Sequence, residues 1–303
     1  MKLKFWKMSG AGNDFVLISV RGLSSAALRR LAVKLCDRKA GIGADGLLCV
    51  NPALFPGRAR PKCGVNKAGA GKVSLRYFNS DGSEAFCGNG SRCAAWWARE
   101  NGYGGSFALA TSRGVLAVKV TGREKIKMRM PAVPAVSLDH KGKYPAPVRT
   151  VHFLNTGVPH AVVPLGNIAA LDVDRLGRLL RFHKAFGPAG ANVDFVELKK
   201  GRVHIRTYER GVEAETLACG TCITAAAVAL GLANGLAVPV LVTAKSGERF
   251  KVWFKAGPSF FAKASKGRGP AKLLPSEADP RGSADDIYIE GPAKTVFEGT
   301  IEI

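Results

Sequence analysis

An internal duplication constrains the fold of this chain more than any other feature of its sequence. Three short landmarks, each a glycine turn or a cysteine–glycine pair, occur twice and in the same order. The matching pairs are Ser9-Gly10 with Thr156-Gly157, Gly43-Ala44-Asp45 with Gly190-Ala191-Asn192, and Cys87-Gly88 with Cys219-Gly220. The first two pairs are 147 residues apart and the third 132, and the shortfall of 15 is about the length of a basic loop in the first half. The pattern therefore predicts two copies of one unit.

Each copy combines short apolar strands with helices. The helical spacing of apolar residues predicts helices over residues 23–38, 91–99 and 174–186. Apolar runs predict strands, among them residues 15–20, 46–50, 73–78 and 115–121. Residues 131–147 hold four prolines and are typical of a crossing between domains. We therefore expect two strand-rich domains, each with a central helix.

The charge of the chain is strongly basic but unevenly distributed. A formal charge of +22 suggests acidic partners, with nucleic acid the first to consider. However, residues 57–72 and 255–282 carry 9 of the 22 excess charges in stretches rich in glycine, proline, alanine and lysine. These stretches lack apolar periodicity and are predicted to be exposed loops. We therefore expect no nucleic-acid partner, with RNA, membrane headgroups or another acidic partner as the functional alternatives for the loops.

The cysteine content and the N-terminal stretch indicate the compartment. Seven cysteines spread through 303 residues do not make a secreted disulfide framework. The basic N-terminal stretch turns polar at Ser9, so it lacks the apolar core of a signal peptide. No apolar run approaches the roughly 20 residues that a membrane helix needs. These features predict a cytoplasmic chain with reduced cysteines and no membrane partner.

Cys87 and Cys219 differ from the other cysteines because each precedes a glycine and a helix-forming run. Backbone N–H groups in the first turn of a helix have no partner within the helix, and with the helix dipole they favour negative charge. Such a position stabilises a thiolate and can also hold the carboxylate of a ligand. A lone cysteine is more often an inert core residue, as we expect for Cys36 and Cys49. For Cys87 and Cys219, the duplicated glycine context instead favours reactive thiols.

If the two copies face each other, their two thiols lie on opposite sides of a cleft. One thiolate can then remove a proton from a stereocentre while the other thiol returns a proton to the opposite face, and the carbon inverts. The α-hydrogen of an amino acid is very weakly acidic, so two helix N-termini aimed at its carboxylate would supply the electrostatic support. This design needs neither a metal nor a cofactor. On oxidation the two thiols can join as a disulfide, so activity should require a reductant.

Seven ordered blocks of sequence carry a family resemblance. The blocks are KMSGAGNDFVLI, GIGADG, FNSDGSEAFCGNGSRCAA, NTGVPHAVV, ANVDFVE, YERGVEAETLACGTC and VFEGTIEI. Together they resemble diaminopimelate epimerase from Lys7 to Ile303, apart from the two basic loops. The resemblance implies a cofactor-independent homodimeric epimerase that converts LL- to meso-diaminopimelate for lysine and peptidoglycan synthesis.

The resemblance also implies the architecture. We expect an α+β fold of two pseudo-symmetric domains, each a curved, mainly antiparallel sheet wrapped around a central helix. The first domain is predicted to span residues 1–132, with 293–303 returning to it, and the second residues 133–292. The active site would lie between the two domains.

The resemblance assigns a role to each site residue. Cys87 and Cys219 would be the base and the acid, exchanging roles with direction, and His160 and Glu209 would tune their pKa values. The backbone N–H groups that would bind the α-carboxylate belong to Gly88, Asn89, Gly220 and Thr221. The side chains that would hold the ammonium and carboxylate groups belong to Asn13, Asn79, Asn192, Glu209 and Arg210. Phe297 would stand at the dimer contact, and no residue is assigned to a metal or cofactor.

Three positions depart from the family pattern. Val158 stands where members often carry Asn, Gly46 where some carry Gln, and Cys222 where a small residue is usual. The third departure creates a Cys-x-x-Cys motif, which leaves a thiol oxidoreductase open as an alternative, although the expected βαβ surroundings are missing. A proline racemase-like isomerase of the same fold is the other alternative. Zinc is less favoured because two suitably spaced Cys-x-x-Cys pairs are lacking.

Overall fold

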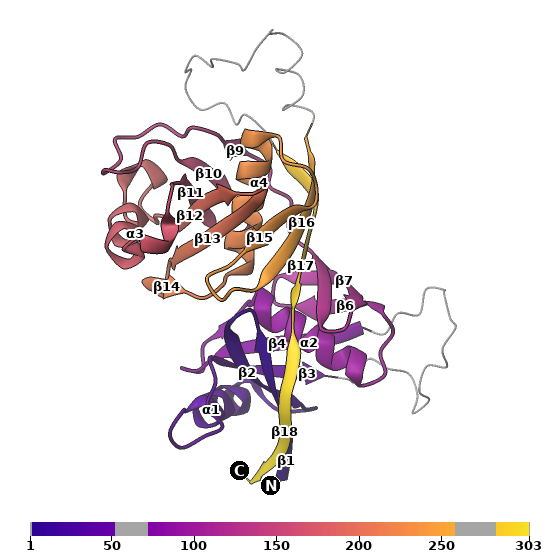
Figure 1. Cartoon of the computed structure of the whole chain (residues 1–303). Helices are drawn as coiled ribbons and strands as arrows, with labels where there is room; N and C mark the ends of the chain where they lie inside the picture. Colours follow the sequence, from indigo (N-terminus) through magenta and orange to yellow (C-terminus); the bar gives the residue numbers. More distant parts are fainter. Residues whose placement is uncertain (1, 52–71, 258–282, 303) are drawn as a thin grey trace. The chain divides into compact units, whose positions relative to one another are not determined.

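The computed structural model describes residues 2–51, 72–257 and 283–302 (Figure 1). Both predicted basic loops lie almost entirely outside these residues, as does Cys63. The chain divides into two compact units. Unit 1 comprises Met1–Arg129 and Glu290–Ile303, and unit 2 comprises Met130–Ile289.

Unit 1 is a sheet with one helix, α2, against many of its strands and a second helix, α1, against β2, β3 and β4. Its elements are β1 (Lys2–Gly10), β2 (Asn13–Ser19), α1 (Ser25–Cys36), β3 (Gly46–Asn51), β4 (Lys72–Asn79), β5 (Glu84–Ala85), α2 (Gly88–Glu100), β6 (Ser106–Thr111), β7 (Gly114–Gly122), β8 (Lys125–Arg129) and β18 (Lys294–Glu302). The last strand, β18, runs antiparallel to β1, with Lys2 opposite Glu302 and Ser9 opposite Lys294. The two ends of the chain therefore meet in this unit (Figure 1).

Unit 2 is built in the same way around α4. Its elements are β9 (Val136–Ser137), β10 (His152–Asn155), β11 (Pro159–Pro164), the 3₁₀ turn η1 (Ile168–Ala170), α3 (Val173–Arg181), the 3₁₀ turn η2 (Lys184–Phe186), β12 (Asn192–Lys199), β13 (Arg202–Glu209), β14 (Ala214–Thr216), α4 (Gly220–Asn234), β15 (Val240–Thr243), β16 (Arg249–Ala256) and most of β17 (Ala284–Pro292). Helix α3 packs against β12, β13 and β14.

The strand pairings repeat in order from one unit to the other. In unit 1, β1–β2 is antiparallel, β2–β3 parallel, β3–β4 antiparallel, β4–β5 antiparallel, β4–β6 parallel and β6–β7 antiparallel. The same six pairings, in the same orientations, run from β10–β11 to β15–β16 in unit 2. In each unit a helix follows the second of these strands and another follows the fifth. The predicted duplication is confirmed, and it extends to the parallel pairings.

Both central helices are enclosed by the strands of their own units. Helix α2 contacts β1, β2, β3, β4, β7, β8 and β18 and packs Ala94, Ala95, Trp97 and Ala98 into the core. In α4, 12 of 15 residues are buried, and its contacts run over β10, β11, β12, β13, β15 and β16. A helix that is apolar on all sides must be covered all round, and the sheet of unit 2 supplies that cover.

The predicted helix limits were wrong by three residues or more at two ends, whereas both ends of α1 (Ser25–Cys36) lie two residues inside the predicted 23–38. Helix α2 begins at Gly88 rather than residue 91, because Ser91 N donates to the carbonyl of Cys87 (2.9 Å) and closes the first turn around Gly-Asn-Gly. Helix α3 ends at Arg181 rather than continuing to residue 186. The backbone of His183 is extended (φ −65°, ψ 132°), and its side chain caps the separate turn η2 by accepting from Ala185 N.

Two further predictions concern the cysteines and the membrane. Cys36 and Cys49 are buried as predicted, and burial raises the pKa of each thiol to about 12. Across residues 2–51, 72–257 and 283–302, no helix has the length and apolar character needed to cross a membrane.

Candidate functional site

Cys87 is the N-cap residue of α2. Its backbone is extended (φ −135°, ψ 115°), and its Sγ accepts a hydrogen bond from Gly90 N at 3.3 Å. The thiol therefore lies against the first turn of the helix, where the dipole stabilises negative charge on sulfur. The side chain is half-buried and packs on the apolar core of unit 1.

The β1–β2 hairpin brings Asn13 to the beginning of α2. Its two-residue turn, Ala11-Gly12, has positive φ at both positions (58° and 93°), a conformation that two-residue hairpins favour. Asn89 Nδ2 donates to Asn13 Oδ1 (2.7 Å), and Asn13 Nδ2 donates to Asp45 Oδ2 (2.9 Å). Two predicted site residues, Asn13 and Asn89, thus share one network, and Asn89 lies two residues after Cys87 in the sequence.

A cluster of ion pairs supports this end of the hairpin. Asp14 binds Lys7 Nζ at 2.7 Å and Arg38 Nη2 at 2.8 Å, and the same Arg38 nitrogen binds Asp45 at 2.7 Å. Burial tends to raise the pKa of the Asp14 carboxyl, but hydrogen bonds from Arg38 and Lys7 outweigh it and hold the pKa well below its usual range. An ionised Asp14 therefore fixes the strand that carries Asn13.

Asn79 ends β4, and Gly46 begins the neighbouring strand β3 directly opposite it. The side-chain amide of Asn79 donates to Ser83 Oγ (2.9 Å) and so serves its own turn. A Cβ at Gly46 would lie 2.4 Å from a ring carbon of Tyr77 and 2.6 Å from the carbonyl oxygen of Phe78. The departure from the family pattern at Gly46 therefore has a structural reason, since the Tyr77 ring occupies the space that a side chain would need.

Cys219 is the N-cap residue of α4, with almost the same backbone conformation as Cys87 (φ −131°, ψ 123°). Ile223 N donates to the carbonyl of Cys219 at 2.9 Å and closes the first helical turn. The Cys219 Sγ lies 3.1 Å from Thr221 Oγ1, and the thiol is half-buried. The two units thus hold their cysteines at equivalent positions, but the sulfur atoms have different hydrogen-bond partners.

Glu209, the last residue of β13, lies against the Cys219 thiol, to which it is hydrogen-bonded. Thr216 Oγ1 donates to Glu209 Oε1 at 2.6 Å. Burial raises the pKa of the Glu209 carboxyl, and the bonds from Thr216 and Cys219 offset only part of that effect. Asn192 Oδ1 accepts from the backbone N–H of Arg210 at 2.8 Å, which fixes the residue that follows Glu209.

His160 is the centre of a buried polar network in unit 2. His160 and Asp194 are both completely buried, and Nδ1 of the imidazole lies 2.8 Å from Asp194 Oδ2. Asp194 Oδ1 accepts from Thr207 Oγ1 (2.9 Å), and His160 Nε2 lies 2.9 Å from Thr156 Oγ1. Thr156 Oγ1 also donates to the carbonyl of Thr221 at 3.5 Å. The network therefore links His160 to the first turn of α4, beside Cys219.

The sequence of the chain matches one protein family. The model of the diaminopimelate epimerase family matches residues 5–135 and 152–271, which is most of the chain. A diaminopimelate epimerase of Aquifex aeolicus is 39% identical over 272 residues, covering 83% of this chain and 90% of that protein. The chain belongs to the diaminopimelate epimerase family. Another relative with that name, from Chlorobaculum tepidum, is 33% identical over 303 residues, covering 98% of this chain and 100% of that protein.

A solved structure outside the diaminopimelate epimerase family shares the fold. A probable proline racemase from Agrobacterium radiobacter superposes with a TM-score of 0.63 at 16% identity, covering 99% of this chain and 93% of that one. At this identity the likeness shows the fold alone. The predicted family, the α+β fold of two pseudo-symmetric halves and the enzyme class, an isomerase, are confirmed.

The other two departures from the pattern of diaminopimelate epimerases lie in unit 2. Near Val158, the side chain of Asn155 accepts from Gly157 N at 2.8 Å, so this amide serves its own turn. Cys222 is completely buried in the first turn of α4. Its sulfur and one ligand atom each of His160 and Asp194 lie within 4.8 Å of one another. Because both ring nitrogens and both carboxylate oxygens already have protein partners, we interpret these groups as a polar core network.

Three polar residues at the site were not assigned from the sequence. Asp194 and Thr156 complete the network around His160, and Arg92 is completely buried in α2, donating to Asn89 Oδ1 (2.7 Å) and to the Pro292 carbonyl (3.2 Å). The sequence did contain a sign of the role of Asp194. An acidic residue in the middle of the apolar strand β12 must find a buried hydrogen-bond partner. The position of Arg92 directly before the apolar run of residues 93–97 in α2 is a similar sign.

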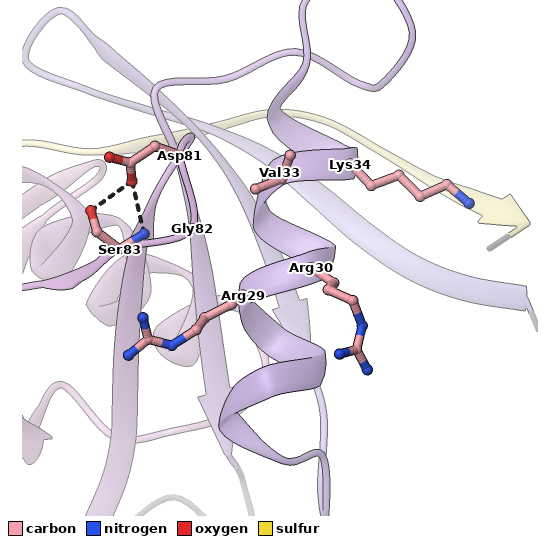
Figure 2. Close-up of a pocket in the computed structure, with 7 residues that line it drawn as sticks. All are labelled: Arg29, Arg30, Val33, Lys34, Asp81, Gly82 and Ser83. Carbon is pink, nitrogen blue, oxygen red and sulfur yellow. Dashed lines mark hydrogen bonds between the residues drawn. The ribbon is translucent and has the colours of Figure 1, made fainter.

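A depression of about 500 Å³ in unit 1 lies away from these residues, between α1 and the turn after β4. Its lining residues are Arg29, Arg30, Val33, Lys34, Asp81, Gly82 and Ser83. Figure 2 shows Arg29 and Val33 directed toward the turn, whereas Arg30 and Lys34 extend from the opposite side of the helix. Asp81 is bonded to Ser83 N (2.8 Å) and Oγ (2.6 Å). The cations do not converge, so the depression lacks the arrangement of a binding site for an anion.

Proposed function

We propose that the chain interconverts LL- and meso-diaminopimelate, with Cys87 and Cys219 moving the α-proton and with no cofactor. The observation that carries this proposal is the repeated thiol position. In two units of the same topology, a cysteine occupies the N-cap position of the central helix with nearly the same extended backbone. Equivalent groups in two halves of a duplicated chain suit a reaction in which both halves act on one carbon.

In the proposed step, the thiolate of one cysteine takes the α-hydrogen of the substrate as a proton, and the electron pair stays on the α-carbon. The thiol of the other cysteine then gives its proton to the opposite face, which balances the charge and inverts the configuration. The two cysteines exchange roles in the reverse direction. The N-cap position supports these roles because it stabilises the thiolate form of either residue.

The negative charge that develops on the α-carbon spreads into the adjacent carboxylate. We assign its stabilisation to the backbone N–H groups of Gly88 and Asn89 in α2 and of Gly220 and Thr221 in α4. Preorganised donors of this kind are each worth about 3–4 kcal/mol of activation free energy in oxyanion holes. Several donors are needed because an amino-acid α-hydrogen is so weakly acidic.

The polar side chains near each cysteine suit the remaining groups of the substrate. We assign the guanidinium fork of Arg210 to a carboxylate and Glu209 to an ammonium group. Asn13, Asn79 and Asn192 complete the set of binding residues. Glu209 also contacts the Cys219 thiol and is placed to tune its pKa, and His160 acts on the first turn of α4 through Thr156.

The assembly and location are part of the proposal. We propose a cytoplasmic homodimer whose contact includes Phe297, and domains at 1–132 with 293–303 and at 133–292. Phe297 and its neighbour Val296 are about half exposed on β18 (49% and 53%). A large, half-exposed aromatic side chain on β18 suits a contact with a second copy.

The experiment follows LL-diaminopimelate by NMR with the reduced protein in D₂O and no added cofactor. We expect the meso product to appear with deuterium at the α-position, and Cys87→Ala and Cys219→Ala each to stop the interconversion. Cys93→Ala is the matched control, because Cys93 is buried in the same helix as Cys87, away from its N-cap. Retained interconversion in either N-cap variant would refute the proposed roles.

The same assay separates the alternatives. Exchange with proline, but not with diaminopimelate, would point to the proline racemase-like reaction. Cys222→Ala leaves an epimerase active, whereas it abolishes a thiol oxidoreductase that uses Cys219 and Cys222.

A further inference from the structure

Cys219 has a second cysteine within its own helical turn. Cys222 is the third residue of α4, and its side chain is hydrogen-bonded to that of Cys219. Side chains at the N-cap and at the third helical position reach toward each other across the open end of a helix, as a capping box does. Positions three residues apart on a helix are also near neighbours, and a disulfide needs Cα atoms roughly 4.4–6.8 Å apart. The sulfur atoms can therefore join by side-chain movement alone.

The equivalent turn of α2 provides an internal comparison. The third helical position after Cys87 is Gly90, where a Cβ would lie 2.7 Å from Leu48 Cδ2. The next cysteine, Cys93, is six residues after Cys87 in the sequence and is packed against Gly10. Of these two turns, the one in α4 is therefore the one that carries a second cysteine at the third helical position.

The two thiols of α4 differ in their access to solvent. Cys219 is half-buried, whereas Cys222 is completely buried. Burial also raises the pKa of the Cys222 thiol well above its ordinary value. An oxidant from solution therefore meets Cys219, and Cys222 reacts only through Cys219.

We propose that Cys219 and Cys222 form a reversible disulfide when the chain meets a peroxide. In the first step, the Cys219 thiolate attacks a peroxide oxygen, so that an S–O bond forms, the O–O bond breaks, and a sulfenic acid and hydroxide result. In the second step, the Cys222 sulfur attacks the Cys219 sulfur, the S–S bond forms and the S–O bond breaks. The departing hydroxide takes the Cys222 proton. Two thiols are oxidised, and one hydrogen peroxide becomes two waters.

The disulfide has two consequences for Cys219. It removes one of the two proton carriers and stops epimerisation, a consequence that rests on the proposed function. It also prevents further oxidation of the sulfenic acid to sulfinic acid, which thiol reductants do not reverse. The formation of the disulfide does not itself depend on what the enzyme does.

The experiment treats the full reduced chain with hydrogen peroxide, alkylates the remaining thiols and digests with trypsin. Cleavage after Arg210 and Lys245 places Cys219 and Cys222 together in peptide 211–245, and Cys87 lies alone in peptide 77–92. We expect peptide 211–245 to become two hydrogens lighter than its dithiol form, without alkylation. Both cysteines remaining alkylated would overturn the proposal, and so would a cross-link between the two peptides, which is the Cys87–Cys219 disulfide expected from the sequence alone.

Activity provides an independent measurement. The wild-type chain should lose its epimerase activity with peroxide and recover it with dithiothreitol. At a peroxide dose that carries an unprotected Cys219 beyond the sulfenic acid to the sulfinic acid, Cys222→Ala should lose activity without recovery, and Cys93→Ala should behave like the wild type. Equal recovery in Cys222→Ala would overturn the protective role. A disulfide in peptide 211–245 with undiminished activity would instead refute the catalytic role of Cys219.

Discussion

Replacement of Asp194 tests the buried network that holds His160. Asp194 has no exposed surface and accepts hydrogen bonds from the imidazole (2.8 Å) and from Thr207 (2.9 Å). Asp194→Ala leaves two buried donors without an acceptor, each at a cost of about 1–3 kcal/mol. Breaking a buried polar pair by removing one partner typically costs about 3–5 kcal/mol. We therefore expect a loss of about 3–5 kcal/mol in the free energy of unfolding.

Asp194→Asn separates the hydrogen-bonding pattern from the shape of the side chain. The amide oxygen can still accept from Thr207, but the amide nitrogen then faces Nδ1 of His160. Because an NH₂ group can only donate, the imidazole must carry its proton on Nε2. We expect a smaller loss of stability, about 1–3 kcal/mol, together with a lower kcat.

Thr207→Val is the matched control. It removes the other hydrogen bond to Asp194 and leaves the contact with His160 in place. We therefore expect a loss of stability similar to that of Asp194→Asn and an unchanged kcat. The assay combines urea unfolding, followed by circular dichroism, with kcat for diaminopimelate interconversion. A loss below about 1 kcal/mol in Asp194→Ala, or full kcat in Asp194→Asn, would refute the reasoning.

Three further predictions concern pH, packing and assembly. Burial raises the pKa of Glu209 above its ordinary value of 4.5, so the stability that this carboxyl contributes is fully present below pH 4.5 and is lost as the pH rises through the raised value. Glu209→Gln should therefore gain Tm relative to the wild type as the pH rises, and a Tm difference independent of pH would contradict this. Gly46→Ala places a Cβ 2.4 Å from a ring carbon of Tyr77 and should lower the unfolding free energy by about 1–3 kcal/mol or more. Gly105→Ala is the control, because no atom lies within 4 Å of its Cβ, and it should change the unfolding free energy by less than about 0.5 kcal/mol. Equal losses in the two variants would show that the Tyr77 ring does not exclude a side chain at Gly46. Phe297→Lys should give a folded monomer in analytical ultracentrifugation, whereas Val115→Lys, at an apolar residue that is also more than half exposed (58%), should remain dimeric. A dimer in both variants would place the contact elsewhere.

The repeat and the presence of a helix after each of Cys87 and Cys219 were predictable from the sequence because they depend on local signals. A glycine after Cys87 and Cys219 and an apolar run behind it suffice to indicate a helix that begins there. The repeated order of elements along the two halves followed from the matching landmarks. The limits of the helices were less predictable, because the break at His183 depends on a cap formed by its own side chain.

The buried polar partners were not predictable from spacing, because they come from separate strands. Asp194 in β12 meets His160 in β11 only through their parallel pairing. The register places His160 beside Asn192, two residues before Asp194. Gly46 is a second example, since the ring that excludes a side chain there belongs to Tyr77 on the adjacent strand.

The measurement that tests the central claim most directly is the early distribution of deuterium between product and unreacted substrate. LL-diaminopimelate is incubated in D₂O with the reduced enzyme, and both pools are examined before equilibrium. If Cys87 and Cys219 act on opposite faces, the meso product carries deuterium from the donating thiol while the remaining substrate keeps its hydrogen. Equal early deuteration of product and substrate would mean that one group removes and returns the proton, and would contradict the two-cysteine mechanism.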